Sequence, residues 1–226
     1  VSIIVTYYKK KKYILKCLKS IFNQSYKNFE VILIFDDNDK NEFEYLKKLK
    51  KKFRKINIYK NKLNLGAGES RNKGIKLSKG KYIAFLDSDD VWLPNKLERQ
   101  LESQIEGSNA LRLIHTNEIW MKNNSKVSQL KKHKKKGGDL FQECLSLCCI
   151  SPSSVLIRRD LFEEIGYFDE NLPACEDYDL WLRICAVEPV LFVDQELIIK
   201  YGGHKDQLSK SHWAMDRFRV YALEKL

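Results

Sequence analysis

The sequence predicts an α/β protein in which helices flank a Rossmann-like, mostly parallel central sheet. Short apolar runs alternate with segments of helical periodicity through the first half of the chain. Polar and acidic residues follow three of these runs, at residues 6–7, 36–37 and 87–90. Because sites in such sheets lie at the carboxyl ends of the strands, we expect these three strand ends to converge on one crevice.

The first half of the chain predicts a regular alternation of strand and helix. Residues 31–35 form a continuous apolar run, as in a parallel strand buried on both faces. Residues 12–23 carry apolar side chains at helical spacing, and Pro94 suits the first turn of a helix. In chain order we expect strands at 2–6, 31–35, 56–59 and 82–86, and helices at 12–23, 43–53, 68 or 70 to 77, and 94–105.

The second half is less regular and predicts a smaller, mixed region. Residues 122–138 have the composition of a polar, basic loop, and Asp160, with Glu163 three residues later, could cap a short helix. No Pro-, Gly- or Ser-rich linker separates the halves 1–110 and 111–226, so we expect one continuous domain. We expect strands at 111–121, 154–157, 191–193 and 197–201, and helices at 140–150, 160–165, 176–186 and 208–226.

The charge of the chain favours anionic partners. With 226 residues it is long enough for one large α/β domain, and its net charge is +11. The lysine runs at 9–12 and 47–52 fit solvated helix faces, whereas residues 131–136 predict a mobile basic loop with nothing to pack, able to touch phosphates or lipid headgroups. A nucleic-acid-binding module is an alternative suggested only by charge. It leaves the ordered acidic residues unexplained, so we expect no nucleic-acid partner.

Hydropathy and cysteine usage predict a protein without a membrane span in a reducing compartment. The mean hydropathy is −0.46, and no apolar run approaches the roughly 20 residues that a span needs. The chain shows no signal-peptide pattern, and its six cysteines do not form paired C-x-x-C spacings. We therefore expect free thiols and a cytoplasmic location.

The most informative segment places Asp87, Asp89 and Asp90 directly after an apolar run. Like charges so close together repel one another unless a cation offsets them. Hard divalent cations such as Mg²⁺ and Mn²⁺ take carboxylate oxygens and are often shared with substrate phosphates. The segment therefore predicts either a metal site that holds a diphosphate or a solvated acidic turn that caps a helix.

Three further features leave alternatives open. Residues 66–71 begin like a dinucleotide-binding motif, but Arg71 stands where that motif has its third glycine. Arg71 either pairs with a diphosphate or with an acid in the crevice, or it lies at the surface. Glu176 and Asp177 either favour the dipole of a helix or supply a general base. His204 follows a strand and is either structural or a ligand of a metal or phosphate.

Several segments in this order resemble the family 2 glycosyltransferases of the GT-A fold, over almost the whole chain. The resemblance implies a nucleotide-sugar donor, a divalent cation (Mn²⁺ or Mg²⁺) and inversion at the anomeric carbon. Each segment is weak alone, whereas the ordered combination is specific. The matching segments are residues 1–8, 20–26, 30–37, 64–66 with 70–75, 85–97 (which contains Asp-Ser-Asp-Asp), 166–169 and 176–183.

The resemblance also assigns residues on the donor side. Thr6 and Tyr7 would flank the nucleobase, and Asp36 would accept a hydrogen bond from its imide N–H. Arg71 belongs to the same donor site. Residues 38–39 are Asn-Asp where the family usually has Gly-Ser, which departs from the ribose-binding pattern.

The same resemblance implies a metal site after the fourth strand. Asp87 would contact the ribose or a metal-bound water, and Ser88 would join the donor site. Asp89 would ligate the metal directly, and His204 would lie near the metal and the diphosphate.

Asp177 is the residue that the resemblance implies as catalytic base, with Glu176 as the competing choice. The expected protein is thus an inverting, metal-dependent hexosyltransferase that uses a UDP-sugar and a glycan or lipid-linked acceptor in cell-surface polysaccharide synthesis. The basic loop and the last helix, with Trp213 and Tyr221, fit contact with an anionic membrane at the inner face of the cytoplasmic membrane. A non-catalytic nucleotide-sugar-binding relative is the alternative.

Overall fold

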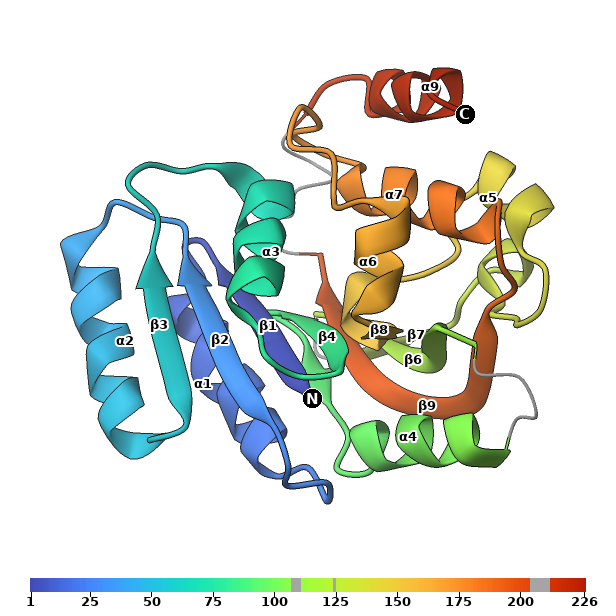
Figure 1. Ribbon diagram of the computed structural model, residues 1–226. Helices are drawn as coiled ribbons and strands as arrows, with labels where there is room; N and C mark the ends of the chain where they lie inside the picture. The colour runs from blue at the N-terminus through green and yellow to red at the C-terminus, as the bar shows by residue number, and fades with distance from the viewer. Residues whose placement is uncertain (107–110, 124, 204–211) are drawn as a thin grey trace.

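The computed structural model describes residues 1–106, 111–123, 125–203 and 212–226, and in this part of the chain the strands form one sheet with helices on both faces (Figure 1). The strand order is β3-β2-β1-β4-β8-β6-β9-β5, and β7 pairs with β6. The strands are β1 Ser2–Tyr7, β2 Glu30–Phe35, β3 Ile56–Lys60, β4 Tyr82–Asp87, β5 Val91–Trp92, β6 Leu113–Lys122, β7 Ser125–Val127, β8 Leu156–Arg158 and β9 Leu191–Gly202.

The helices pack on the two faces of this sheet. Helices α1, α2 and α4 contribute buried residues to one hydrophobic cluster, and α3, α5, α6, α7 and α9 contribute to the other. Two 3-10 turns complete the described elements, η1 Lys131–His133 and η2 Pro152–Ser154. The helices are α1 Lys11–Phe22, α2 Lys40–Lys52, α3 Gly66–Leu77, α4 Lys96–Glu106, α5 Phe141–Ser146, α6 Asp160–Ile165, α7 Glu176–Cys185 and α9 Asp216–Glu224.

The first four strands are parallel and end at one edge of the sheet. In the register of β1, Thr6 lies opposite Ile34 of β2 and Asp87 of β4. The second half is mixed, because β8 runs antiparallel to both β4 and β6, whereas β6 and β9 are parallel. The predicted α/β fold and the convergence of the strand ends are confirmed.

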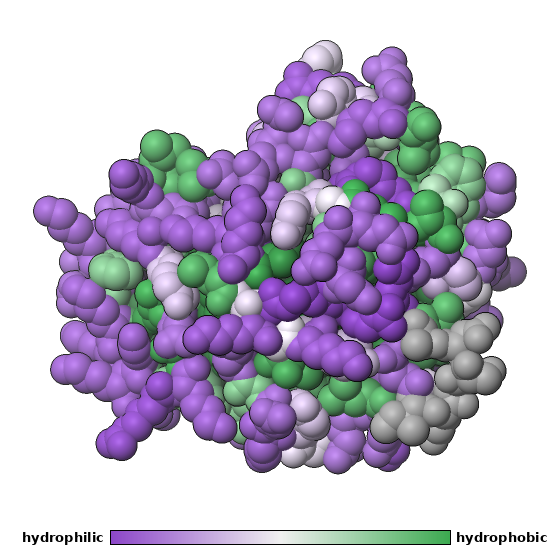
Figure 2. Space-filling model, in the orientation of Figure 1, coloured by the Kyte–Doolittle hydropathy of each residue, from purple (hydrophilic) through white to green (hydrophobic). Residues whose placement is uncertain are grey.

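Side-chain alternation along the strands explains why both faces of the sheet are covered. Ile3 and Val5 join the cluster under α1, while Ile4, between them, joins the cluster under α7. Successive strand residues point to opposite faces, so a strand that is apolar throughout needs helices on each side. Figure 2 shows the outer surface of one side, where hydrophilic side chains predominate.

Several predicted boundaries need correction. Helix α2 begins earlier than predicted because the Asp39 side chain accepts hydrogen bonds from the backbone N–H groups of Asn41 and Glu42. Helix α4 begins at Lys96, not at Pro94, because Pro94 and Asn95 form a turn between β5 and the helix. Asp160 does not cap α6; it pairs with Arg158 at 2.8 Å.

Other differences concern the second half. The two strands expected at 191–193 and 197–201 are one strand, β9. The terminal helix expected at 208–226 begins later, because the described residues 212–215 are not helical and α9 begins at Asp216; residues 204–211 lie outside the described residues. None of the described helices is long and apolar enough to cross a membrane.

The prediction that residues 131–136 form a loop with nothing to pack is wrong. The segment contains η1, and Lys135 is only 7% exposed. Its ammonium group lies 3.2 Å from Glu118 and donates a hydrogen bond of 2.8 Å to the carbonyl of Cys149. A buried carboxylate on β6 thus fixes a lysine that the sequence suggested would be solvated.

Candidate functional site

Asp36 lies just past β2, and its carboxylate holds the start of α3. The side chain is 3% exposed and accepts hydrogen bonds from Asn61 Nδ2 and the backbone N–H of Leu65 at 2.8 Å, and from that of Gly66 at 2.9 Å. Gly66 has a φ of +88°, which glycine adopts readily. The predicted contact between Asp36 and a nucleobase stays a prediction, because both carboxylate oxygens already accept bonds from the chain.

Tyr7 points into the core and not toward the crevice. Its side chain is fully buried, its ring stacks on Phe35 with centroids 5.7 Å apart, and its hydroxyl bonds to Glu42. Burial and the Glu42 carboxylate raise the pKa of Tyr7 above its ordinary range. Thr6, by contrast, is half-buried, and the contact of Thr6 and Tyr7 with a nucleobase stays a prediction.

Two carboxylates of the acidic turn after β4 are paired with cations from other segments of the chain. Asp87 accepts from Arg71 of α3 at 2.9 Å, and Asp89 pairs with Lys10, just before α1, at 2.9 Å. The Ser88 side chain is buried, at 4% exposure. This arrangement excludes a fully solvated acidic turn, because the carboxylates are held by a specific set of partners.

Asp90 has a different environment from the two acids before it. It is 3% exposed, and its carboxylate accepts from Ser153 Oγ at 2.7 Å and from the backbone N–H of Tyr201 at 3.3 Å. Burial raises the pKa of Asp90 well above its ordinary range. This residue ties the acidic turn to η2 and β9.

Arg71 joins the acidic turn to the start of α7. The side chain is 5% exposed; Nη2 lies 2.9 Å from Asp87, and Nη1 lies 2.5 Å from Glu176. Burial lowers the pKa of Arg71, but the two carboxylates outweigh it and raise the pKa. Of the sequence alternatives, pairing with an acid in the crevice is confirmed, and a surface position is wrong.

Glu176 and Asp177 are neighbours with opposite exposure. Glu176 is 3% exposed, and burial raises its pKa to about 7 although Arg71 opposes this shift. Asp177 is half-buried, accepts from the N–H of Tyr178 at 2.8 Å and lies 3.8 Å from the thiol of Cys148. Asp177 lines a cavity of about 230 Å³, whereas Glu176 does not.

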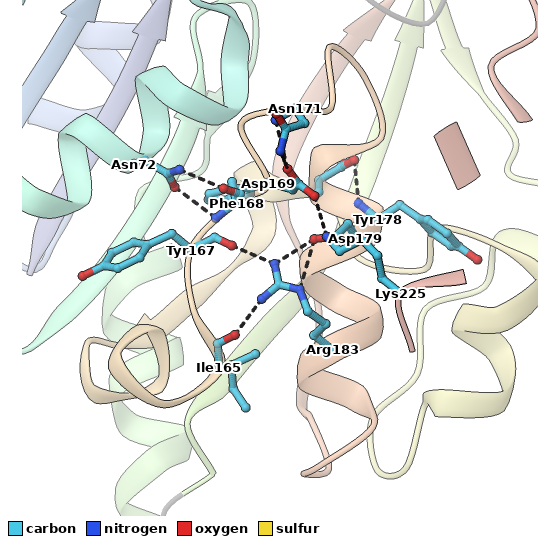
Figure 3. Close-up of polar contacts among 11 residues, drawn as sticks. Asn72, Ile165, Tyr167, Phe168, Asp169, Asn171, Tyr178, Asp179, Arg183 and Lys225 are labelled. Carbon is cyan, nitrogen blue, oxygen red and sulfur yellow. Dashed lines mark hydrogen bonds and ion pairs between the residues drawn. The ribbon is translucent and has the colours of Figure 1, made fainter. Parts of the chain in front are cut away.

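Helix α7 is fixed by a polar network that Figure 3 shows from the side of α3. Asn72 of α3 exchanges two hydrogen bonds with the backbone of Phe168, at 2.8 and 3.0 Å. Asp179 accepts from Arg183 at 2.8 Å and from Lys225, the residue just after α9, at 2.6 Å. Arg183 also donates to the carbonyl of Tyr167 at 2.7 Å, and so α7 is joined to α3 through the residues next to Phe168.

Two charged residues of the site were missed from the sequence, Glu118 of β6 and Lys200 of β9. Lys200 donates to Ser151 Oγ at 3.1 Å; burial lowers its pKa, but Glu118, Asp90 and other carboxylates outweigh this and raise it. Burial opposes ionisation of Glu118, yet Lys200 and Lys135 lower its pKa to about 2. Both strands contain other charged residues, Lys122 in β6 and Asp194 and Glu196 in β9, so nothing in the sequence singled out this pair.

The acidic turn suits a divalent cation that takes part of its coordination from a substrate. Among the residues that the structure describes, no group of three or more His, Cys, Asp or Glu side chains could hold a metal. Mg²⁺ and Mn²⁺ nevertheless bind through one or two carboxylates together with phosphate oxygens and water. Asp87 and Asp89 provide such a pair, and His204 lies outside the described residues.

Comparison with known proteins agrees with this geometry. Residues 2–166 match the family described as Glycosyl transferase family 2. An uncharacterized glycosyltransferase of Methanocaldococcus jannaschii, MJ1057, is 32% identical over 205 residues, which cover 88% of this chain and 69% of that protein. The Escherichia coli protein WfgD, named UDP-Glc:alpha-D-GlcNAc-diphosphoundecaprenol beta-1,3-glucosyltransferase, is 29% identical over 219 residues, 97% of this chain and 81% of WfgD.

The fold is shared with a solved structure of Staphylococcus aureus TarS, residues 1–349, in complex with UDP-GlcNAc. The TM-score is 0.79 at 21% identity, over 96% of this chain and 62% of that one. The chain spans about a third of several other curated relatives that it matches. The family match covers most of the chain, and the chain therefore belongs to glycosyl transferase family 2, a family of glycosyltransferases, as the sequence motifs predicted.

Proposed function

We propose that the protein transfers a hexose from a nucleoside diphosphate sugar, with UDP-sugars as the first candidates, to a hydroxyl of a glycan or lipid-linked acceptor. Two relatives support this choice. The name of WfgD specifies a UDP-glucose donor and a diphosphoundecaprenol-linked acceptor, and TarS was crystallised with UDP-GlcNAc. A lipid-linked acceptor would place the reaction at the inner face of the cytoplasmic membrane.

The observation that carries the proposal is that Arg71 pairs both with Asp87 and with Glu176, the residue next to Asp177. Asp177 opens into the cavity, while Glu176 and Asp87 are both engaged by the guanidinium. An open carboxylate beside a cavity can take the proton of an acceptor hydroxyl as that oxygen attacks the anomeric carbon. One direct displacement of this kind inverts the anomeric configuration.

Asp89 and Asp87 are the residues that would hold a divalent cation. When bound, such a cation neutralises the charge that develops on the departing nucleoside diphosphate. Lys10, paired with Asp89, and Arg71, paired with Asp87, add fixed positive charge on the same side. In the proposal, Thr6, Asp36 and Ser88 complete the donor side.

The proposal is tested by the thermal stability of the protein with UDP-, GDP-, dTDP- and CMP-sugars, each with Mn²⁺ and with EDTA. A ligand at about 100 times its Kd adds roughly 2.7 kcal/mol to the free energy of unfolding, worth several degrees in Tm for a domain of this size. We expect one nucleotide class to stabilise the protein and EDTA to remove most of the effect. Folded protein that responds to none of these donors would contradict the proposal.

Asp89→Asn serves as the matched variant for the metal. Because it keeps the size of the side chain, it should lose the Mn²⁺-dependent part of the stabilisation while keeping the Tm of the free protein within a few degrees. If Asp89→Asn responded to Mn²⁺ and donor like the wild type, the metal would have other ligands.

A further inference from the structure

The cavity beside Asp177 is lined by residues of the second half of the chain, from Glu118 to Lys200, whereas the proposed donor residues belong to the first half. None of the described residues that line it belongs to β1, β2, β3 or β4. Its walls come from β6, β9, the segment 132–135 and the segment 147–152 that follows α5, with Asp177 at one side. In Figure 1, α5 lies at the opposite end of the molecule from β2 and β3.

The lysines of this cavity fall into two groups. Lys135 and Lys200 are held inside, where Glu118 faces both of them. Lys132 and Lys134 are exposed, and no ion pair to either is present among the described residues. Two cationic side chains therefore remain at the mouth of the cavity without an acidic partner in the described chain, facing space that Asp177 also lines.

The aromatic wall of the cavity is rigid. The indole N–H of Trp120 donates to Glu118 at 2.7 Å, and the Trp120 ring lies 5.2 Å from that of His133. A fixed aromatic side chain gives a sugar ring an apolar surface, while polar groups nearby set its orientation. The cavity beside these two rings has a volume of about 230 Å³.

We propose that this cavity binds an acceptor that carries a phosphate or diphosphate next to its hydroxyl-bearing sugar, with the phosphate oxygens at Lys132 and Lys134. The inference rests on the proposed function, because it takes Asp177 as the base that the acceptor hydroxyl meets. The donor diphosphate has its own cations, Arg71 and Lys10, at the acidic turn. The lysines at the cavity mouth are thus left for a second anionic group, on the acceptor.

The test compares two probes that share one sugar, the octyl ester of N-acetylglucosamine 1-diphosphate and the neutral octyl N-acetylglucosaminide. Binding is measured by calorimetry with UDP and Mn²⁺ at saturation, so that the donor site is filled. We expect the wild type to bind the diphosphate ester at least about tenfold more tightly than the neutral glycoside. Lys132→Ser with Lys134→Ser should lose roughly that factor on the ester and nothing on the glycoside.

The matched control is Lys131→Ser with Lys51→Ser. Both lysines are exposed and outside the cavity, and the control removes the same charge. It should keep the wild-type preference for the ester. An equal loss in both double variants would mean that only net charge matters, and equal binding of the two probes by the wild type would also overturn the proposal.

Two further arms separate the sources of phosphate. If inorganic pyrophosphate bound as tightly as the ester, the cavity would be a plain anion site and the assignment to an acceptor would be wrong. If the Lys132 and Lys134 variant lost binding to phosphatidylglycerol vesicles but kept its preference for the ester, these lysines would serve a lipid surface. UDP affinity, measured alone, tests the proposed function separately from the cavity.

Discussion

Arg71 joins the acidic turn to the start of α7, because it pairs with Asp87 in the first and with Glu176 in the second. Arg71→Met would leave Glu176 buried without its cation, and breaking a buried pair in this way costs about 3 kcal/mol or more. Arg99→Met is the control, because Arg99 and Glu102 form an exposed pair that should contribute less than about 1 kcal/mol. Urea denaturation of both variants gives the comparison, and equal stabilities would show that Arg71 does not brace the site.

Lys96 at the start of α4 is fully buried and should make stability depend on pH. Its side-chain nitrogen, Nζ, donates to Gln100 Oε1 at 2.7 Å and lies 4.2 Å from the centre of the Trp92 ring. Burial lowers the pKa of Lys96 well below its ordinary 10.5. Between the lowered pKa and 10.5, Lys96 is protonated in the unfolded chain but not in the folded protein. The free energy of unfolding therefore falls as the pH falls through this range, and the contribution of Lys96 to stability is complete only above pH 10.5.

Lys96→Met removes this titration. Relative to the wild type, the variant should therefore gain stability as the pH falls from about 10 to about 7. Part of the gain is offset by the loss of the bond to Gln100, worth about 1 kcal/mol at every pH. The difference between the two proteins in urea midpoints, followed across this pH range, is the measurement. A difference that does not change with pH would show that Lys96 stays protonated in the fold.

At the scale of elements, α9 is attached to α7 by Lys225. The Lys225 ammonium lies 2.6 Å from Asp179, which is 1% exposed, and 2.5 Å from Asp169 (Figure 3). Lys225→Met should weaken the docking of α9 by about 1–3 kcal/mol, because hydrogen bonds to charged groups are worth this much. Hydrogen exchange of the α9 amides should then become faster while that of the amides in β1 stays the same.

The control for α9 is Lys76→Met, since Lys76 is exposed and lies 4.0 Å from Glu170. Its exchange pattern should match that of the wild type. Unchanged α9 exchange in Lys225→Met would show that packing of Ala222, which is 2% exposed, suffices to hold the helix.

The elements also show what the sequence could and could not predict. The parallel strands were predictable because strands buried on both faces are continuous apolar runs. Strand β9 was divided in two because residues 194–196 are polar and exposed, although the chain stays extended there. Its pairing with β6 passes irregularities on either side of Asn117, and such register shifts leave no local signal.

The candidate site, like the fold, could be predicted from the sequence only in part. The acidic turn was predictable because acids that follow strands mark the functional edge of such sheets. The acids in the first turn of α7 were indicated by the resemblance to family 2 glycosyltransferases. The placement of Glu118, Lys200 and Lys135 depends on pairing between distant strands. Each of these residues lies in a segment with other polar or charged residues, so its partner could not be identified from the sequence. Burial of Tyr7 was missed because a polar strand end does not reveal which way its last side chain points.

At the scale of the whole molecule, the chain packs as one unit. Each hydrophobic cluster combines residues from both halves, with Ile4 and Trp181 in one and Leu33 and Ile198 in the other. The boundary between the clusters is the sheet and not a position in the sequence. The division into a donor half, 1–110, and an acceptor half, 111–226, stays a prediction about function.

The central claim is that Asp177 is the base of a sugar transfer between two sites joined by Arg71. The most direct test compares Asp177→Asn and wild type in kcat for transfer, with UDP affinity measured on both. We predict that kcat falls by about 10²–10⁴-fold, the usual contribution of a general base, while the Kd for UDP stays the same. Transfer by Asp177→Asn at a rate near that of the wild type would contradict the account.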